Sequence, residues 1–273
     1  LFIMVLAYLI VRKLKNRRFA VRFTAVSGIS ALVLMILAYD IYMMTGISVY
    51  IADCNDGINI AVSSDRNNSA VTYGGSKAYD LFEYLETRRI SEFEYLMLAK
   101  PSSYYVKNAS EILSAYSVNN IGIYDSEKAD KNLMNLAETK SKIIEYKPDI
   151  QNNVSLPNYK ITSIETKGGV FTHFTFGGDF DILVIPNGGD CLEAPKEWLN
   201  STVCVMSELP KNYEFLRPAE IILSCSDENV YEPYSNLESI CDTIYATCFE
   251  DNIRMRISQG GEVSIWSEDS WLS

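Results

Sequence analysis

The chain has one histidine among its 273 residues, and this limits the chemistry open to it. A two-metal hydrolase holds its ions with several imidazole and carboxylate ligands, which one histidine cannot supply. His173 lies in Phe171–Thr175, an alternating run typical of a strand. No Gly-x-Ser-x-Gly elbow is present, so a serine hydrolase triad is not indicated either. We predict a strand-surface or hydrogen-bonded role for His173.

The cysteines could form disulfides or hold a metal, but their spacing is typical of neither. No pair has Cys-x-x-Cys or another metal-ligand spacing. Cys204 and Cys225 lie in apolar, strand-like runs, where buried thiols are common. Buried thiols are therefore the favoured interpretation, and disulfides stay open. The six cysteines are Cys54, Cys191, Cys204, Cys225, Cys241 and Cys248.

Turn residues suggest no cofactor site. The glycine doublets lack the Gly-x-x-x-x-Gly-Lys-Ser/Thr spacing of a phosphate loop. Asp53, Asn55 and Asp56 could hold Ca²⁺, but an Asx-rich hairpin turn is the favoured interpretation. The sequence therefore predicts no cofactor, no catalytic residue and no metal ligand.

Residues 1–44 predict a transmembrane hairpin. Phe23–Tyr39 is apolar and uncharged, and it approaches the 20 or so residues that a bilayer core requires if Arg22 reaches the interface. Leu1–Val11 is a second apolar run, which we expect to be a truncated helix because the chain starts inside it. A basic loop, residues 12–22, joins it to the second helix at about 23–44. The chain is then a fragment or a cleaved product.

Charge predicts the orientation of this hairpin. Residues 1–44 carry a net charge of +5, so the whole-chain value of −11 leaves −16 on residues 45–273. The positive-inside bias places loop 12–22 in the cytoplasm. We therefore expect a multi-pass cell-membrane protein with residues 45–273 as an extracytoplasmic domain.

Short strands alternate with helices after Gly46, which predicts a layered α/β domain. The predicted strands are Ile47–Ala52, Ile58–Ser63, Ala70–Tyr73, Tyr95–Ala99, Asn119–Tyr124, Val170–Phe176, Asp181–Ile185, Val203–Met206, Glu220–Ser224, Ile253–Ser258 and Glu262–Trp266. The predicted helices are Lys77–Arg88, Ala109–Tyr116 and Lys128–Glu138. The polar stretch Asp149–Asn158 is predicted to be a loop.

This order of elements behind a membrane hairpin resembles the C-terminal part of the ComEC family, polytopic channels that internalise DNA during bacterial competence. In that family a metallo-β-lactamase-like domain begins with a strand and an Asp-Val-Gly-Gln-Gly-Asp turn. The turn Asp53–Ile58 stands there in this chain, and Tyr73-Gly74-Gly75 stands where the family has Asp-Gly-Gly. The family's metal motif, Leu-Thr-His-x-x-x-Asp-His, corresponds to Leu98–Tyr105, in which Lys100 replaces a ligand with a cation.

The resemblance continues into the distal half. Arg217–Ser224 is similar to the family's Lys-Pro-x-x-Ala-Ile-Ile-Ser strand, and Glu232-Pro233 stands at its His-Pro pair. The resemblance implies an αββα sandwich of the metallo-β-lactamase type that has lost its metal ligands. The positions that it marks as vestiges of the site are Asp53, Asp56, Tyr73, Lys100, Tyr104, Tyr105 and Glu232.

The resemblance implies a DNA-uptake membrane protein whose outer domain is a non-enzymatic structural or docking module. Its implied partners are the membrane and other channel or competence proteins. Non-specific DNA binding depends on Lys and Arg, and a domain at −16 opposes it, so we expect DNA contact through the part of the protein outside this chain. The alternative is a membrane-anchored extracytoplasmic binding or sensing module unrelated to DNA transport.

Overall fold

The chain divides into two compact units, residues 1–45 and 46–273. The computed structural model describes residues 26, 28–38, 46–52, 54, 57–65, 67–74, 79–99, 107–124, 129–225, 230–250, 252–258 and 261–267.

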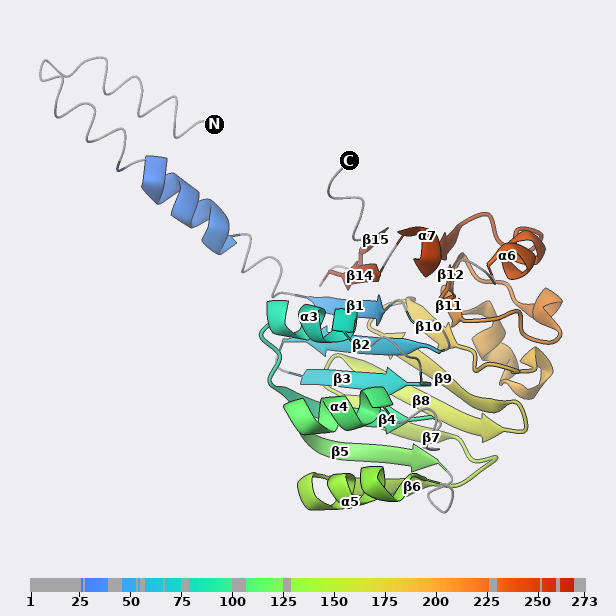
Figure 1. Cartoon of the computed structure of the whole chain (residues 1–273). Helices are drawn as coiled ribbons and strands as arrows, with labels where there is room; N and C mark the ends of the chain where they lie inside the picture. Colours follow the sequence, from blue (N-terminus) through green and yellow to red (C-terminus); the bar gives the residue numbers. More distant parts are fainter. Residues whose placement is uncertain are drawn as a thin grey trace, which may run out of the picture. The chain divides into compact units, whose positions relative to one another are not determined.

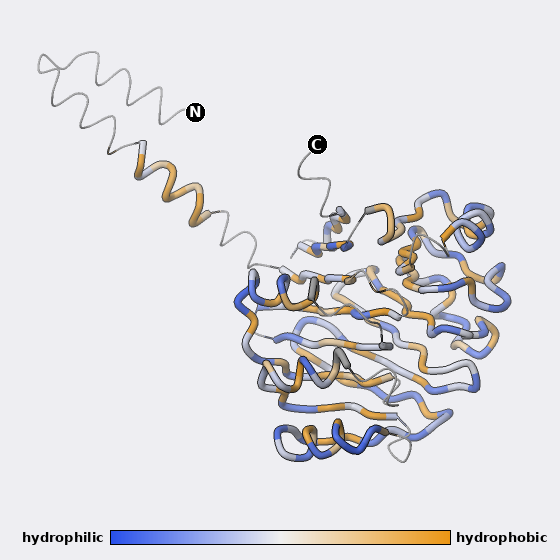
Figure 2. The backbone as a smooth tube through the Cα atoms, viewed as in Figure 1, coloured by the Kyte–Doolittle hydropathy of each residue, from blue (hydrophilic) through white to orange (hydrophobic). Residues whose placement is uncertain are grey.

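In the first unit, residues 28–38 form a helix with exposed apolar side chains such as Ile29 and Met35. Figure 2 shows this helix as a continuous hydrophobic segment. Within the described residues, no helix combines the length and the hydropathy that a membrane span requires. The remainder of the predicted hairpin, including loop 12–22, lies outside the described residues, so the hairpin stays a prediction.

Two β-sheets dominate the second unit (Figure 1). Sheet A has the order β15-β14-β1-β2-β3-β4-β5-β6, and sheet B has the order β13-β12-β11-β10-β9-β8-β7. The strands of sheet A are β1 (Ile47–Ala52), β2 (Asn59–Ser64), β3 (Asn67–Thr72), β4 (Glu92–Leu98), β5 (Ser117–Tyr124), β6 (Lys142–Tyr146), β14 (Ile253–Ile257) and β15 (Val263–Ser267). Those of sheet B are β7 (Asn152–Leu156), β8 (Tyr159–Thr166), β9 (Gly169–Phe176), β10 (Asp181–Val184), β11 (Val203–Met206), β12 (Glu220–Leu223) and β13 (Ile244–Ala246).

Helices cover the outer face of each sheet. The helices α3 (Tyr79–Thr87), α4 (Lys107–Ala115) and α5 (Lys131–Lys140) pack on sheet A. Sheet B is covered by η2 (Cys191–Glu193), η3 (Lys196–Asn200), η4 (Tyr213–Phe215), α6 (Tyr231–Leu237) and α7 (Thr247–Glu250). The mixed α/β architecture with two packed sheets agrees with the prediction from the sequence.

Strand β1 shows why the sandwich forms. Val49 and Ile51 point into the core between the sheets, whereas Tyr50 and Ala52 point into the core under the helices. All four side chains are buried, because a strand covered on both faces has no solvent-facing side. Continuous apolar runs of this kind are the signal by which the buried strands could be predicted.

Tyrosine hydroxyls connect the two sheets through the core. Tyr159 of β8 donates to Ser69 of β3 at 2.7 Å, and Tyr124 of β5 bonds Ser163 of β8 at 2.7 Å. At the end of β3, the hydroxyl of Tyr73 bonds that of Thr172 in β9. These hydrogen bonds pair polar groups that the packing of the two sheets buries.

One predicted element is wrong. The stretch Asp149–Asn158 contains β7, which forms an antiparallel hairpin with β8. β7 is the edge strand of sheet B, and its residues are exposed or half-buried. An edge strand can therefore be polar throughout, and its composition hides it from a search for apolar runs.

Candidate functional site

Strands β3, β4 and β5 are parallel, and so are β10, β11 and β12 (Figure 1). Their carboxyl ends gather at one end of the sandwich, which we call the carboxyl edge. Ser224, just after β12, donates to the carbonyl of Gly57 in the β1–β2 turn at 3.1 Å, which joins the two sheets there. Ligands of α/β sheets bind at such an edge, so this is where a site is expected.

Tyr73 occupies the end of β3 at this edge. Its side chain is buried between the sheets, and its hydroxyl bonds Thr172. Burial raises the pKa of Tyr73 far above its usual value, so the phenol stays protonated. A neutral, internally bonded phenol is a poor substitute for a carboxylate ligand.

Other polar groups at the carboxyl edge bond one another. The amide nitrogen of Asn59 donates to Cys54 Sγ at 2.9 Å and to the Gly74 carbonyl at 3.0 Å. The backbone N–H of Gly188 donates to the Glu208 carboxylate. These bonds hold the turns at the edge in place, which is a structural role.

His173 lies on β9 and faces away from the core between the sheets. Its neighbour Phe174 points into that core, and successive strand residues point to opposite faces. The His173 ring stacks on Trp198 of η3 with centroids 5.0 Å apart, and its Nε2 lies 2.8 Å from Asp181 Oδ2. The hydrogen-bonded role predicted for this histidine is confirmed.

Asp181 is the centre of this outer-face network. Its other carboxylate oxygen accepts from the backbone N–H of Thr202 at 2.7 Å and from its hydroxyl at 2.9 Å. Burial raises the pKa of Asp181, but the hydrogen bonds from His173 and Thr202 outweigh it and lower the pKa overall. The network links β10 to η3. It also engages the His173 imidazole in a hydrogen bond to Asp181 and a ring stack on Trp198.

The structure describes two of the positions predicted as vestiges of a site. Tyr73 is buried, whereas Glu232 is exposed on α6. The two side chains therefore do not form one buried site. The other predicted positions, Asp53, Asp56, Lys100, Tyr104 and Tyr105, lie outside the described residues.

The described residues do not fit a metal centre. Among them there is no group of three or more His, Cys, Asp and Glu side chains that could hold an ion. Burial raises the pKa of the Cys191 thiol to about 12 and also raises that of Cys204. Both thiols stay protonated, and a metal binds the thiolate.

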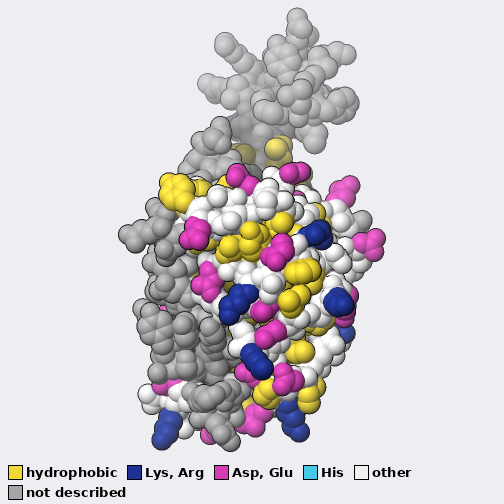
Figure 3. All heavy atoms as spheres, turned by 90° about the vertical axis from the view of Figure 1, so that its right-hand side faces the viewer, with side chains coloured by type: hydrophobic (Ala, Val, Ile, Leu, Met, Phe, Trp, Pro, Cys, Tyr) yellow, Lys and Arg dark blue, Asp and Glu magenta, His cyan; other side chains and the backbone are white. Residues whose placement is uncertain are grey.

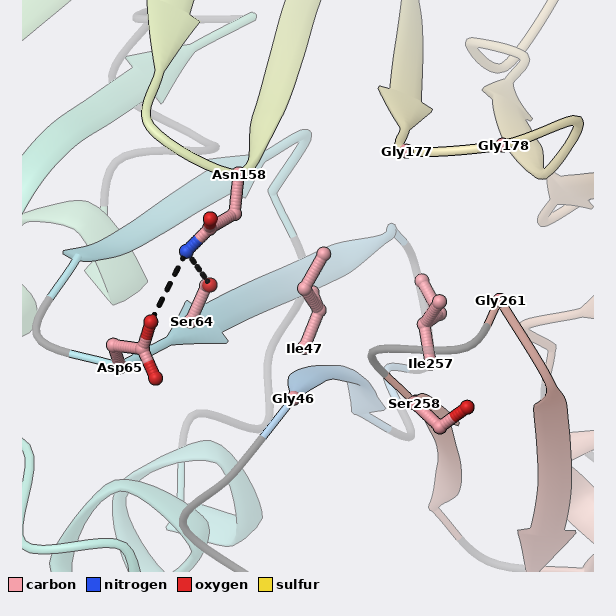
Figure 4. Close-up of a pocket in the computed structure, with 10 residues that line it drawn as sticks. All are labelled: Gly46, Ile47, Ser64, Asp65, Asn158, Gly177, Gly178, Ile257, Ser258 and Gly261. Atoms are coloured by element: carbon pink, nitrogen blue, oxygen red, sulfur yellow. Dashed lines mark hydrogen bonds between the residues drawn. The ribbon is translucent and has the colours of Figure 1, made fainter.

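A pocket of about 490 Å³ lies at the opposite end of the sandwich (Figure 4). The register places it there, because Ser64 at the end of β2 pairs with Asn67, whereas Asn59 pairs with Thr72 at the carboxyl edge. Asn158 donates to Ser64 Oγ at 2.6 Å and to Asp65 Oδ2 at 3.3 Å in its wall. The remaining lining residues are Gly46, Ile47, Gly177, Gly178, Ile257, Ser258 and Gly261.

Binding is the chemistry that this pocket suits. Among the lining residues that the structure describes, Asp65 is the one ionisable side chain, and no nucleophile–base pair accompanies it. The pocket could not be predicted from the sequence, because turns from four hairpins form it only after the sheets have packed.

No family model matches the chain, and no curated protein is similar to it in sequence. Solved structures do match. The metallo-β-lactamase fold protein YhfI from Bacillus subtilis has a TM-score of 0.54 at 12% identity, over 73% of this chain and 95% of that one. A diphosphatase of the PhnP family has a TM-score of 0.50 at 10% identity, over 73% and 94%.

A variant of the CmlA β-hydroxylase has a TM-score of 0.52 at 8% identity, over 77% of this chain and 54% of that one. Identities this low show the fold alone, and the link to ComEC proteins stays a prediction. The chain is thus similar to metallo-β-lactamase-like proteins in its mixed α/β fold with two packed sheets.

Proposed function

We propose that this chain is the C-terminal part of a ComEC-like membrane protein for DNA uptake, and that residues 45–273 act as a non-catalytic structural or docking module. The sequence motifs around Asp53–Ile58, Tyr73–Gly75 and Arg217–Ser224 support the family assignment. The metallo-β-lactamase-like fold is consistent with it.

One observation carries the non-catalytic part of the proposal. The chain has one histidine, and that residue faces outward from β9 into a bond with Asp181 and a stack on Trp198. A hydrolase with two metal ions needs several such ligands at one site. Tyr73 adds no anionic ligand, because its hydroxyl is buried and bonded to Thr172.

Metal content and turnover test this proposal directly. The purified chain is incubated with Zn²⁺ or Mn²⁺, desalted and assayed for bound metal and for phosphodiesterase activity, beside an active two-metal phosphodiesterase as positive control. We expect metal far below one ion per chain and no turnover above the blank. One or two bound ions with activity that a chelator removes would contradict the proposal.

The upstream coding sequence tests the family assignment separately. A ComEC-like protein is polytopic, so several further transmembrane helices are expected before Leu1. A coding sequence with few or none would favour the alternative module instead.

That alternative, an extracytoplasmic binding or sensing module, is favoured by the pocket at the end opposite the carboxyl edge. Figure 3 shows acidic side chains spread over one face of the molecule among apolar ones. A small polar ligand that raises the melting temperature of the wild type, and not of an Asn158→Trp variant, would support it. Equal shifts in both proteins would exclude the pocket as the binding site.

A further inference from the structure

Two cysteines distant in sequence lie side by side at the carboxyl edge. The Sγ atoms of Cys225 and Cys248 are 3.8 Å apart. Cys225 follows β12, and Cys248 lies in the first turn of α7, which follows β13. The contact therefore joins the ends of two neighbouring strands of sheet B.

The register of the sheet explains this contact. β12 and β13 are parallel, and Leu223 pairs with Ala246. Cys225 lies two residues beyond Leu223, and Cys248 lies two residues beyond Ala246, so both thiols follow the carboxyl ends of these paired strands. The backbone N–H of Cys225 donates to Thr247 Oγ1 at 3.3 Å, so the two segments stay together beyond the strands.

This placement suits a disulfide bond. A disulfide bond has an S–S length of about 2.05 Å, and the two sulfur atoms are already in contact at 3.8 Å. Cys225 is buried at 2% exposure, whereas Cys248 is half-buried, so Cys248 is the more accessible residue of the two.

We propose that Cys225 and Cys248 are a redox-active thiol pair, whose substrate is a low-molecular-weight disulfide such as oxidised glutathione. The Cys248 thiolate, having lost its proton to solvent, attacks one sulfur of the reagent and expels one thiolate, which takes up a proton. Cys225, having also lost its proton to solvent, then attacks Cys248 Sγ in the mixed disulfide and expels the second thiolate, which takes up a proton. Two protein thiols are oxidised to one disulfide, and one reagent disulfide is reduced to two thiols.

The bond would fix the carboxyl edge. Phe249, next to Cys248, packs against Tyr231 and Tyr234 of α6 with centroids 6.3 and 6.4 Å apart. Ser224, next to Cys225, holds the β1–β2 turn. Oxidation would therefore join α7, whose Phe249 packs on α6, covalently to the segment after β12. That segment carries Ser224, which bonds the β1–β2 turn of sheet A.

Thiol mapping tests the pair. The full chain is equilibrated in glutathione buffers from reducing to oxidising, quenched with acid, alkylated and analysed by peptide mass spectrometry without reductant. We expect two of the six thiols to disappear together and one cross-linked peptide that joins Cys225 to Cys248. In the oxidised chain the melting temperature should rise by roughly 5–10 °C, and dithiothreitol should reverse the rise.

Variants separate this pair from the other thiols. Cys248→Ser should abolish the cross-link, and because Cys248 is only half-buried we expect its circular dichroism to match the wild type. Cys241→Ser is the matched control, because a serine hydroxyl can replace the thiol hydrogen bonds to the Ala219 and Thr243 carbonyls, and it should keep the cross-link. Six intact thiols in the most oxidising buffer, or a cross-link between other cysteines, would overturn the proposal.

Discussion

Buried tyrosine hydroxyls are the main polar groups inside the sandwich. Tyr73, Tyr124 and Tyr159 each reach a serine or threonine on the facing sheet. Burial raises the pKa of all three, so they act as neutral hydrogen-bonding groups. At the end of β3, the phenol of Tyr73 is a packing and hydrogen-bonding group between the sheets.

Tyr159→Phe should therefore destabilise the domain. The change leaves the fully buried hydroxyl of Ser69 without its 2.7 Å partner, which costs about 1–3 kcal/mol of unfolding free energy. Urea denaturation of the two proteins measures the difference. Tyr231→Phe is the control, because that side chain is 73% exposed, and it should leave the stability unchanged.

The lowered pKa of Asp181 predicts a pH dependence of stability. Its folded pKa lies below the unfolded value of about 3.9, so its contribution is complete above that value and is lost as the pH falls through the folded pKa. Asp181→Asn should lower stability by about 1 kcal/mol at pH 6, and the gap to the wild type should shrink at pH 3.

Urea denaturation at pH 6, 4 and 3 measures this gap. Asp179→Asn changes an exposed carboxylate two residues away and should show no such gap. A gap of equal size at all three pH values would contradict the role assigned to the Asp181 carboxylate.

At the scale of elements, strand β5 depends on a glycine at its centre. Gly122 lies beneath Tyr95 of β4 and Tyr146 of β6, whose hydroxyls bond each other at 2.9 Å above it. A Cβ at position 122 would meet the Tyr95 hydroxyl and would lie 2.7 Å from Tyr146 Cε2. The glycine thus leaves the space in which two large side chains from neighbouring strands meet.

Gly122→Ala should cost about 1–3 kcal/mol of unfolding free energy through overpacking. Gly177→Ala is the matched control, because a Cβ there meets no atom within 4 Å, and it should be close to neutral. Thermal denaturation of both variants checks this. Equal melting temperatures for the two variants would show that the sheet accommodates the methyl group.

Elements differ in how well the sequence predicts them. The strands covered on both faces, such as β1, β11 and β12, are mostly apolar and were predicted close to their observed bounds. The edge strand β7 was missed because its residues are exposed or half-buried and most of them are polar. Apolar runs in a sequence predict buried strands, and an edge strand with few buried side chains does not produce such a run.

At the scale of the whole molecule, charge opposes DNA binding by the domain. Residues 45–273 carry −16, and phosphate recognition depends on Lys and Arg. Lys140 of α5 is already bound within the protein, because its Nζ donates to the Leu113 carbonyl at 2.7 Å.

Fluorescence anisotropy with labelled DNA should therefore show no binding at about 150 mM salt, at which non-specific contacts weaken steeply. Any binding at low salt should come from the basic residues 12–22. It should be lost in Arg17→Gln/Arg18→Gln and kept in the control Lys131→Gln/Lys142→Gln. Binding at high salt that depends on Lys131 and Lys142 would show a DNA surface on the domain.

The sequence alone determined that the chain has a single imidazole and which apolar segments form buried strands, because residue types and apolar runs are local properties. One histidine cannot supply a set of metal ligands, whatever the fold. Only the tertiary structure decided where His173 points, which tyrosines connect the sheets and which thiols meet. Those outcomes depend on strand register and sheet packing: the 3.8 Å contact between Cys225 and Cys248 follows from a parallel pairing that neither residue's neighbours in sequence reveal.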